Sequence, residues 1–446
     1  MDRPRRPFRL TTVLALLVAL ALPGLTSPLR AQEGGIDPAD TAWVLIASAL
    51  VLLMTPGLAF FYGGLVRRKN VLSILMQCFL CMSLMTVLWV VLGFSLAFAP
   101  DALGGIVGGL DYAFLRGVTF EAWDGTAIPA QLFMLFQGMF AIITPALIIG
   151  AFAERMRFSA MCWFSSLWLI LVYCPVAHWV WGGAEGFFGL GGDGALDFAG
   201  GTVVHINAGV AALVAAILLG RRQGYPAATS PPHNLPFAVL GTGLLWFGWF
   251  GFNAGSALSA GASAVNAMVT THVATAAAAL TWAVIEWVRH SKPTVLGVIT
   301  GAVAGLVAIT PACGSVSPLG SLAVGAGASI ASYLAVAWVK TKLGYDDSLD
   351  VFGVHGVAGI WGALSAGLLA TAATPGNDTN GLFYGNPVQV LIQLKAVVYT
   401  FVWSGLLSFA LLKLISLFVP LRVGNDEERI GLDLTAHSEA AYTVVE

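Results

Sequence analysis

The chain has 446 residues, of which 58% are hydrophobic and only 10% are charged, and its formal net charge is −2. This composition excludes an ordinary soluble domain and indicates an all-α polytopic membrane protein. Near-neutrality gives no reason to expect nucleic-acid binding. The five cysteines lie in or beside apolar runs, so the sequence indicates neither a disulfide framework nor a zinc site.

The first 31 residues have the layout of a secretory signal peptide. Four arginines between residues 3 and 9 precede a short apolar run, residues 10–22, which Pro23 and Gly24 end. We predict cleavage near Ala31. The alternative is an uncleaved anchor helix, although a run of this length is short for a membrane span.

Eleven long apolar segments follow the signal peptide, and they predict eleven transmembrane helices. The connections between the spans form two alternating sets. One set holds almost all of the basic residues, and the other holds only Arg116. By the positive-inside rule, the mature N-terminus lies outside and the tail, residues 420–446, lies in the cytoplasm. We therefore expect a multi-pass protein of the inner (plasma) membrane. The predicted spans are residues 42–64, 71–98, 128–151, 159–181, 198–219, 235–256, 265–289, 295–311, 320–340, 350–371 and 391–418.

The fifth and tenth spans share a pattern that indicates two copies of one unit within the predicted membrane domain, residues 32–419. Each of these spans begins with an Asp, carries a His further along, and continues as an apolar run. Because five spans is an odd number, consecutive copies must be inserted in opposite orientation, as in many transporters. We predict repeat one at residues 42–219, repeat two at residues 235–371, and a last span, residues 391–418, outside the repeat.

The two histidines of these spans, His205 and His355, are the strongest candidates for function. A rise of about 1.5 Å per residue puts His205 roughly 12 Å below Asp197, near mid-membrane, where an ionisable side chain marks a pathway or a site. Small residues follow each His at the third and fourth positions, Ala208-Gly209 and Ala358-Gly359. Such residues let two helix backbones approach closely, so both imidazoles are expected to face one pore.

Aromatic and hydroxyl side chains suggest what such a pore would pass. Trp181 and Ser256 fall at outer helix ends, where an indole face beside a hydroxyl suits a small cation that donates hydrogen bonds. Phe140 lies further inside and is expected to act as a hydrophobic gate, since hydrated ions cannot shed their water cheaply against apolar rings. Neutral imidazoles deeper in the pore suit a polar neutral solute or a proton relay.

Four motifs resemble the ammonium transporter family, which includes the Amt, Mep and Rh proteins. The resemblance runs from about residue 42 to residue 442 and favours a bacterial Amt-type member. It implies an eleven-helix fold, a homotrimer with one pore per subunit, ammonium as the substrate, no enzymatic activity and no cofactor. The motifs are PGLAFFYGG at residues 56–64, LDFAGGTVVH at residues 196–205, GWFGFNAGS at residues 248–256 and DVFGVHG at residues 350–356.

The resemblance also implies roles for individual residues. Ammonium would be recruited outside, lose its proton near the gate and cross the lower pore as ammonia, with the proton on a separate hydrated route that makes transport electrogenic. A bulky thioether at Met139 departs from members that have a small residue beside the gate. The implied positions are Phe140, Trp181 and Ser256 for the outer ammonium site, Phe140 and Phe252 for the gate, His205 and His355 for the pore, and Asp197 for a structural or pathway acid.

The C-terminal segment, residues 431–442, resembles the family's tail motif. In the family this tail helps to couple subunits and receives a regulatory protein of the PII type, so such a partner is expected at the cytoplasmic face. His272 is a further membrane histidine without a matching family role. Glu154 is expected to pair locally with Arg155, its neighbour in sequence.

Alternatives remain open at this point. Asp197 is as well explained by capping its helix as by a pathway role, and Asp350 is interpreted as an N-cap. A membrane oxidoreductase would use His205 and His355 as axial haem ligands. A sensor would bind ammonium and signal through its tail and a PII-type partner with little flux.

Overall fold

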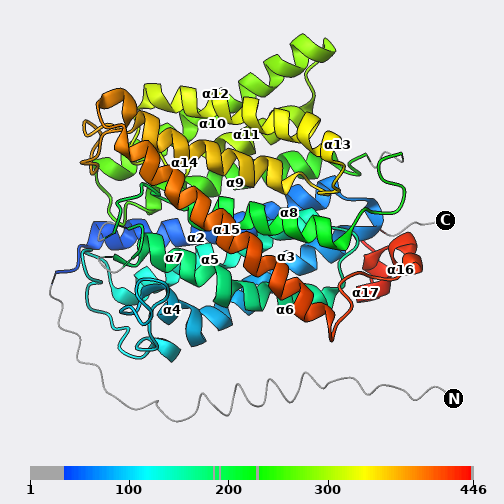
Figure 1. The fold of residues 1–446 in the computed structure, drawn as a ribbon, viewed down its shortest axis with the longest axis horizontal. Coiled ribbons are helices and arrows are strands. Elements are labelled where there is room, and N and C mark those ends of the chain that lie inside the picture. Colours follow the sequence, from blue (N-terminus) through cyan, green and yellow to red (C-terminus); the bar gives the residue numbers. More distant parts are fainter. Residues whose placement is uncertain (1–34, 184–185, 190–191, 228–230, 443–446) are drawn as a thin grey trace.

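The computed structural model of the chain describes residues 35–183, 186–189, 192–227 and 231–442. The predicted signal peptide lies outside the described residues. Long helices run side by side and form the body of the molecule (Figure 1). In chain order they are α2 (Pro38–Leu65), η1 (Arg68–Asn70), α3 (Val71–Leu88), η2 (Trp89–Gly93), α4 (Phe94–Phe98), η3 (Ala113–Leu115), α5 (Ala130–Phe152), α6 (Phe158–Trp168), η4 (Leu169–Tyr173), α7 (Cys174–Trp181), η6 (Gly201–Ile206), α8 (Asn207–Leu219), α9 (Leu235–Gly255), α10 (Ala262–His290), α11 (Val295–Ile309), α12 (Pro318–Leu334), η7 (Ala335–Val339), α13 (Lys340–Leu343), η8 (Phe352–Val357), α14 (Ala358–Leu369), η9 (Leu382–Tyr384), α15 (Val388–Ser416), α16 (Asn425–Ile430) and α17 (Leu432–His437).

Ten helical segments of the described residues are long and apolar enough to cross a membrane. Several of them are composite, because a π-helical turn joins two α-helices, as η2 joins α3 to α4 and η4 joins α6 to α7. The predicted span at residues 295–311 forms α11, which has 15 residues. A helix of that length rises roughly 22 Å, less than a hydrocarbon core of about 30 Å. The chain is therefore an all-helical, multi-pass membrane protein.

Polar side chains fix where several spans begin. The Asp37 side chain accepts hydrogen bonds from the first amides of α2, and the Asn234 side chain accepts the amide of Phe237 in α9. In the same way, Thr294 accepts an amide of α11 and Ser317 accepts an amide of α12. These residue types are preferred at helix N-termini because a short side chain with an oxygen satisfies amides that lack an intrahelical acceptor. These caps therefore mark the residues at which the four helices begin.

The helices α2 and α9 pack against each other through glycines. A Cβ atom on Gly241 of α9 would lie 2.2 Å from the amide nitrogen of Phe61 and 2.6 Å from the carbonyl oxygen of Gly57. Only a residue without a side chain fits there, so the two backbones come into direct contact. Such small-residue contacts are the usual way in which membrane helices associate closely.

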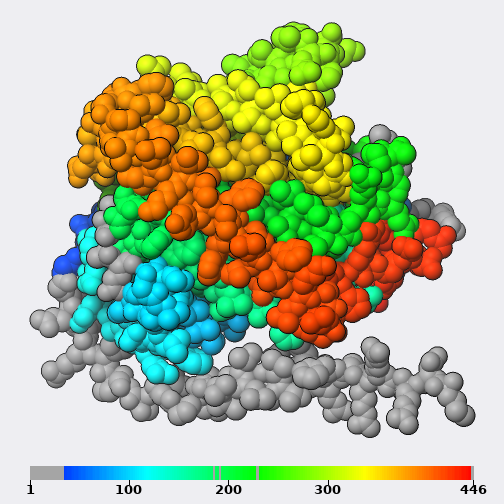
Figure 2. All heavy atoms as spheres, viewed as in Figure 1, coloured from blue at the N-terminus to red at the C-terminus, as the bar shows by residue number. Residues whose placement is uncertain are grey.

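The last long helix, α15, crosses one face of the bundle (Figure 2). It packs against α6, α8 and α14. The tail helices α16 and α17 lie at the end of the bundle where α15 stops, and α17 contacts α3. The Asp433 carboxylate accepts the amide of Ser73, and the Asn70 side chain accepts the amide of Leu432. The tail is thus held against the bundle by buried hydrogen bonds.

A buried ionic cluster joins distant connections at the same end of the bundle. Arg222 donates two hydrogen bonds to Asp346, from Nε at 2.9 Å and from Nη2 at 2.8 Å. Its Nη1 lies 3.4 Å from Glu154, which also pairs with Arg67 at 2.8 Å. The expectation that Glu154 pairs with neighbouring Arg155 is therefore wrong, because the fold brings two arginines from other connections to this carboxylate.

The protonation of Asp346 follows from this geometry. Burial alone would raise the pKa of Asp346, but the hydrogen bonds and the charge of Arg222 outweigh burial and hold the pKa below its usual value. A carboxyl whose pKa is lower in the folded state stabilises that state at pH values above its unfolded pKa, about 3.9. Its contribution is lost as the pH falls through the lowered value.

We predict that Asp346→Asn lowers the thermal-unfolding midpoint by several degrees at pH 7, because it removes the carboxylate that accepts two hydrogen bonds from the buried Arg222 guanidinium and leaves only the longer contact with Glu154. Breaking a buried pair in this way costs about 3–5 kcal/mol. Differential scanning fluorimetry of detergent-purified protein measures the effect, and the difference from wild type should close only below about pH 4.

The matched control is Asp426→Asn, since Asp426 pairs with Arg429 at 3.1 Å on the surface and both side chains are more than 70% exposed. Exposed pairs contribute little, so its midpoint should match that of wild type. Equal midpoints for the two variants at pH 7 would contradict the role given to the buried cluster.

Candidate functional site

Each of the two candidate histidines lies on a π-helical turn that begins a span. His205 belongs to η6, which continues as α8, and His355 belongs to η8, which continues as α14. π-Helical turns are rare and are frequent at functional sites, since the wider turn shifts the side chains out of the regular helical register. The sequence pattern predicted the two spans but contained no signal for these turns.

The structure brings the two imidazoles together. The Nδ1 atoms of His205 and His355 lie 3.3 Å apart, and the ring centroids are 5.4 Å apart with an interplanar angle of 22°. A hydrogen bond between two ring nitrogens needs one donor and one acceptor, so one Nδ1 carries a proton and the other does not. Both side chains are at least 97% buried.

Glycines allow this approach, as the small residues after each His predict. A Cβ atom on Gly209 would lie 2.3 Å from the amide nitrogen of Gly356. On the other helix, a Cβ atom on Gly359 would lie 3.2 Å from the Cβ atom of His205. The backbones of η6–α8 and η8–α14 therefore touch next to the histidines, and this contact sets the distance between the imidazoles.

A narrow apolar cavity lies beside the imidazole pair. Its volume is about 10 Å³, close to the smallest volume that holds one water molecule. Trp249 and Phe252 of α9 line it together with both histidines. The indole of Trp249 stacks on His205, with centroids 5.4 Å apart at 19°, and its Nε1 donates to Thr310 Oγ1 at 2.9 Å. Sequence analysis gave Trp249 no role, although it lies one helical turn before Phe252.

Two phenylalanines separate this narrow cavity from a much larger one. Phe140 of α5 and Phe252 have ring centroids 4.3 Å apart, and both are buried. Phe140 also lines a cavity of about 480 Å³, which we call the Trp181 cavity. Phe252 lines the narrow cavity on the other side. The two rings, tilted by 41° to each other, therefore stand between the two spaces, and Met139, which is buried next to Phe140 in sequence, lines neither of them.

The Trp181 cavity brings together the other predicted site residues. Trp181, Ser256 and Asp197 all line it, and the Trp181 ring lies 5.6 Å from Phe140 at 79°. The indole Nε1 of Trp181 donates to the carbonyl oxygen of Asp197 at 3.0 Å, and the Ser256 hydroxyl donates to the carbonyl oxygen of Phe252 at 2.8 Å. Because both protons are engaged, the cavity meets a ring face and a hydroxyl lone pair.

Asp197 has the geometry of a helix cap. Its carboxylate accepts the amides of Gly200 at 3.0 Å, Thr202 at 2.9 Å and Val203 at 3.2 Å, and also the Thr202 hydroxyl. It thereby satisfies the free amides at the start of η6. In this way Asp197 fixes the helix that carries His205 and, through its carbonyl oxygen, the indole of Trp181.

The equivalent cap on the second helix is Asp347 rather than Asp350. The carboxylate of Asp347 accepts the amide of Phe352 at 2.8 Å, at the start of η8. Asp350 instead pairs with Lys340, with Nζ 2.6 Å from Oδ1. The interpretation of Asp350 as an N-cap is therefore wrong, because the positive φ of 59° at Asp350 turns the chain so that the earlier carboxylate meets the helix start.

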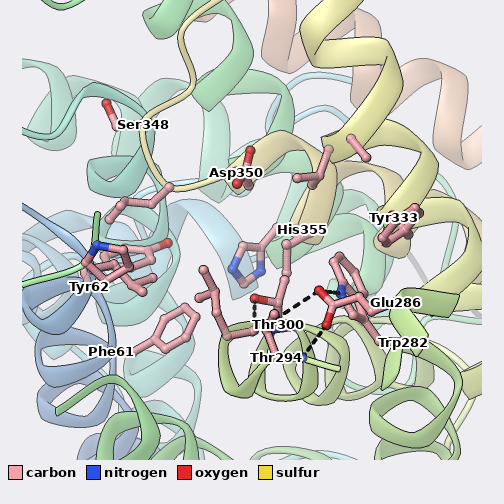
Figure 3. Close-up of a pocket in the computed structure, with 18 residues that line it drawn as sticks. Phe61, Tyr62, Trp282, Glu286, Thr294, Thr300, Tyr333, Ser348, Asp350 and His355 are labelled. Carbon is pink, nitrogen blue, oxygen red and sulfur yellow. Dashed lines mark hydrogen bonds between the residues drawn. The ribbon is translucent and has the colours of Figure 1, made fainter. Parts of the chain in front are cut away.

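A third cavity, the Asp350 cavity, reaches the histidines from the other side (Figure 3). Its volume is about 380 Å³, and it is lined by His355 together with the acidic residues Asp350 and Glu286. Glu286 accepts hydrogen bonds from the amide of Thr294 at 2.6 Å and from its hydroxyl at 3.1 Å. His355 lines both this cavity and the narrow one, so the imidazole pair lies between the Asp350 cavity and the narrow apolar cavity.

The geometry does not suit haem ligation. Two axial imidazoles hold an iron atom between their nitrogens, each at about 2 Å. Here the two Nδ1 atoms are 3.3 Å apart, and the cavity beside them is about 10 Å³ in volume. The interpretation as a membrane oxidoreductase is therefore wrong for this pair of histidines, since no macrocycle fits between them.

Comparison with known proteins agrees with the arrangement of the site. The profile of the ammonium transporter family matches residues 42–442. The chain belongs to the ammonium transporter family. It is 50% identical over 404 residues to an ammonium transporter of Bacillus subtilis, covering 90% of this chain and 98% of the relative. An ammonium transporter of Aquifex aeolicus is 51% identical over 415 residues, with 93% and 96% covered.

Solved structures agree with the fold of this ammonium transporter. The crystal structure of Saccharomyces cerevisiae Mep2 superposes with a TM-score of 0.83 at 35% sequence identity, and the match covers 88% of this chain and 89% of that chain. The protein is thus an ammonium transporter and not an enzyme.

We predict that Gly209→Ala lowers ammonium transport by this protein at least tenfold, because the added methyl group pushes η8 away and separates the imidazoles. Ammonium-induced current in proteoliposomes, scaled to the amount of folded protein, measures the effect. The control is Gly243→Ala on α9, where a Cβ atom meets nothing within 4 Å. Wild-type currents in both variants would contradict the importance of this helix contact.

Proposed function

We propose that this transporter binds ammonium in the Trp181 cavity, removes one proton and conducts ammonia through the narrow cavity past His205 and His355. The observation that carries the proposal is the hydrogen-bonded imidazole pair beside a narrow apolar cavity, with a wider cavity on either side of this segment. A charged solute would have to lose its hydration against apolar rings, whereas a neutral one escapes most of that cost.

The proposed binding site consists of Phe140, Trp181 and Ser256. The support is their common cavity, the ring face of Trp181 and the free lone pair of the Ser256 hydroxyl. An ammonium ion has four N–H groups, so it donates to the hydroxyl while its charge lies against the aromatic rings. Such a cation–π contact contributes on the order of 1–2 kcal/mol when it is partly desolvated.

The proposed gate is the pair Phe140 and Phe252. Rings 4.3 Å apart leave no opening between the two spaces, so a solute passes only when the rings rotate. The narrow cavity behind them has room for about one small molecule. A hydrated ion does not fit, and ammonia does.

The released proton is proposed to cross separately, which makes transport electrogenic. The imidazole pair supports this step, since each neutral ring has one donor and one acceptor and the two rings already share a hydrogen bond. We propose that Asp197 contributes to this step by positioning other residues. Its carboxylate fixes η6 and its carbonyl oxygen fixes Trp181, so one residue aligns both ends of the upper pathway.

The transporter domain is proposed to consist of two inverted repeats, residues 42–219 and 235–371, with an eleventh span at residues 391–418. Equivalent elements support this division, since α2 packs on α9 and η6–α8 packs on η8–α14. The fourth and fifth spans of both halves also contain π-helical turns, namely η4 and η6 in the first and η7 and η8 in the second. Ten helical segments in the described part of the chain are long enough to cross a membrane, and the short α11 completes the proposed count of eleven.

We propose an orientation in the plasma membrane with the mature N-terminus outside and the tail, residues 420–446, in the cytoplasm. The distribution of basic residues supports it. Arg67, Arg222 and Arg422 lie at the same end of the bundle, together with the tail helices. The Trp181 cavity then opens to the outside and the Asp350 cavity to the cytoplasm. A PII-type regulatory protein is proposed to dock at this cytoplasmic end.

A homotrimer is proposed for the assembly, with one pore per subunit. His272 supports an interface between copies because it lies on an exposed face of α10, within a membrane span. Its ring contacts Trp246 and Phe250, at 5.4 Å and 6.2 Å. An imidazole facing hydrocarbon has no hydrogen-bond partner, whereas a neighbouring subunit supplies one.

Ammonium-induced current in proteoliposomes tests the function. Wild type should give a saturable current with ammonium and none with potassium, and His205→Ala should lower the ammonium current at least tenfold because the hydrogen-bonded pair is lost. The control is His290→Ala at the end of α10, which should keep the wild-type current.

Two outcomes would contradict the proposal. Undiminished current in His205→Ala would remove the histidine pair from the pathway. Ammonium binding by wild type without any current would favour a sensor that signals through its tail.

A further inference from the structure

One polar side chain on the pathway has no role in the proposed binding site. Gln137 lies on α5 between Phe133 and Phe140, four residues after the first and three before the second. Residues at this spacing share one face of a helix. All three line the Trp181 cavity, so this face of α5 forms one wall of it. Gln137 is the polar member of that face, directly before the gate.

The opposite side of α5 is held by Trp89 of η2. The indole Nε1 of Trp89 donates to the carbonyl oxygen of Met134 at 3.0 Å. A Cβ atom on Gly138 would lie 2.9 Å from the same indole. These two contacts fix the rotation of α5, and with it the direction in which Gln137 points.

The amide oxygen of Gln137 is buried and has no hydrogen-bond partner among the described residues. The residue as a whole is only 9% exposed. Leaving a buried acceptor unpaired costs about 1–3 kcal/mol. A half-turn of the amide exchanges its oxygen and nitrogen without moving the rest of the side chain, so the oxygen can face the cavity, where a donor that enters can bond to it.

The other polar groups of the cavity wall show which kind of ligand is complementary. The Trp181 N–H is engaged by the carbonyl oxygen of Asp197, and the Ser256 proton by that of Phe252. Next to the gate, the Ser256 lone pair and the Gln137 oxygen are the acceptors beside aromatic ring faces, and the loop residues Asn377, Asp378 and Thr379 add further acceptors to the wall. This set fits a small cation with several N–H donors.

We propose that Gln137 is a specificity-determining residue of the Trp181 cavity, where its amide oxygen accepts a hydrogen bond from the ammonium ion alongside the Ser256 hydroxyl. The inference deepens the proposed function and rests on the binding site proposed above. Two acceptors and two ring faces match the four N–H groups of ammonium. Each methyl group on an alkylated analogue removes one donor.

The experiment compares half-saturating ammonium concentrations of proteoliposome currents, which do not depend on how much protein is folded. Gln137→Leu keeps the approximate volume and removes the acceptor, so its half-saturating concentration should rise about tenfold or more, as expected for a hydrogen bond to a charged group. Gln137→Glu keeps an acceptor and should stay at or below the wild-type value. The matched control is Gln131→Leu on the same helix, whose amide bonds to the carbonyl oxygen of Val118 outside the cavity.

Trp181→Leu separates failure of the inference from failure of the binding site. If it raises the half-saturating concentration while Gln137→Leu does not, Gln137 is no ligand and the inference is overturned. If neither variant changes it, the binding site itself is wrong and the inference falls with it. If Gln137→Leu does not fold, Gln137→Met replaces it, with the same expected rise and the same contradicting result.

Discussion

The contact between the helices η6–α8 and η8–α14 is the constraint on which the proposed pathway depends. Gly209 and Gly359 leave no space between these backbones, and the imidazoles that extend beside the contact lie at hydrogen-bonding distance. Any side chain at Gly209 would separate the pair. The neighbouring cavity has a volume of about 10 Å³, so the proposed pathway is narrowest where the two imidazoles are paired with each other.

The rest of the bundle supports this contact from both sides. Asp197 and Asp347 cap the helices that carry the two histidines, so each imidazole is positioned by a carboxylate at its own helix start. Phe252 and Trp249 cover the pair on one side, and the indole stacks on His205. Charge is concentrated in the wider cavities and in the buried ionic cluster around Arg222, away from the narrow segment. In the proposed pathway the charged groups thus lie apart from the narrow apolar segment.

Sequence predicted the features that depend on local pattern. The apolar segments, the two Asp/His spans and the small residues after each His follow from composition and spacing, and resemblance pointed to the aromatic residues near the gate. Contacts between distant connections were not predictable in this way. Glu154 meets Arg67 and Arg222 instead of its neighbour, and Asp347 replaces Asp350 as a cap because of one residue with positive φ. The π-helical turns have no sequence signal, and α11 is shorter than its apolar run suggested.

Solid-state ¹⁵N NMR of histidine-labelled transporter in lipid bilayers tests the central claim most directly. The chain has seven histidines, and the His205→Ala and His355→Ala variants assign the two signals of interest. Paired neutral rings predict one protonated and one bare Nδ1, with a coupling across the hydrogen bond between them. Two protonated Nδ1 atoms, or the absence of any coupling between the rings, would contradict an imidazole pair in a dry pore.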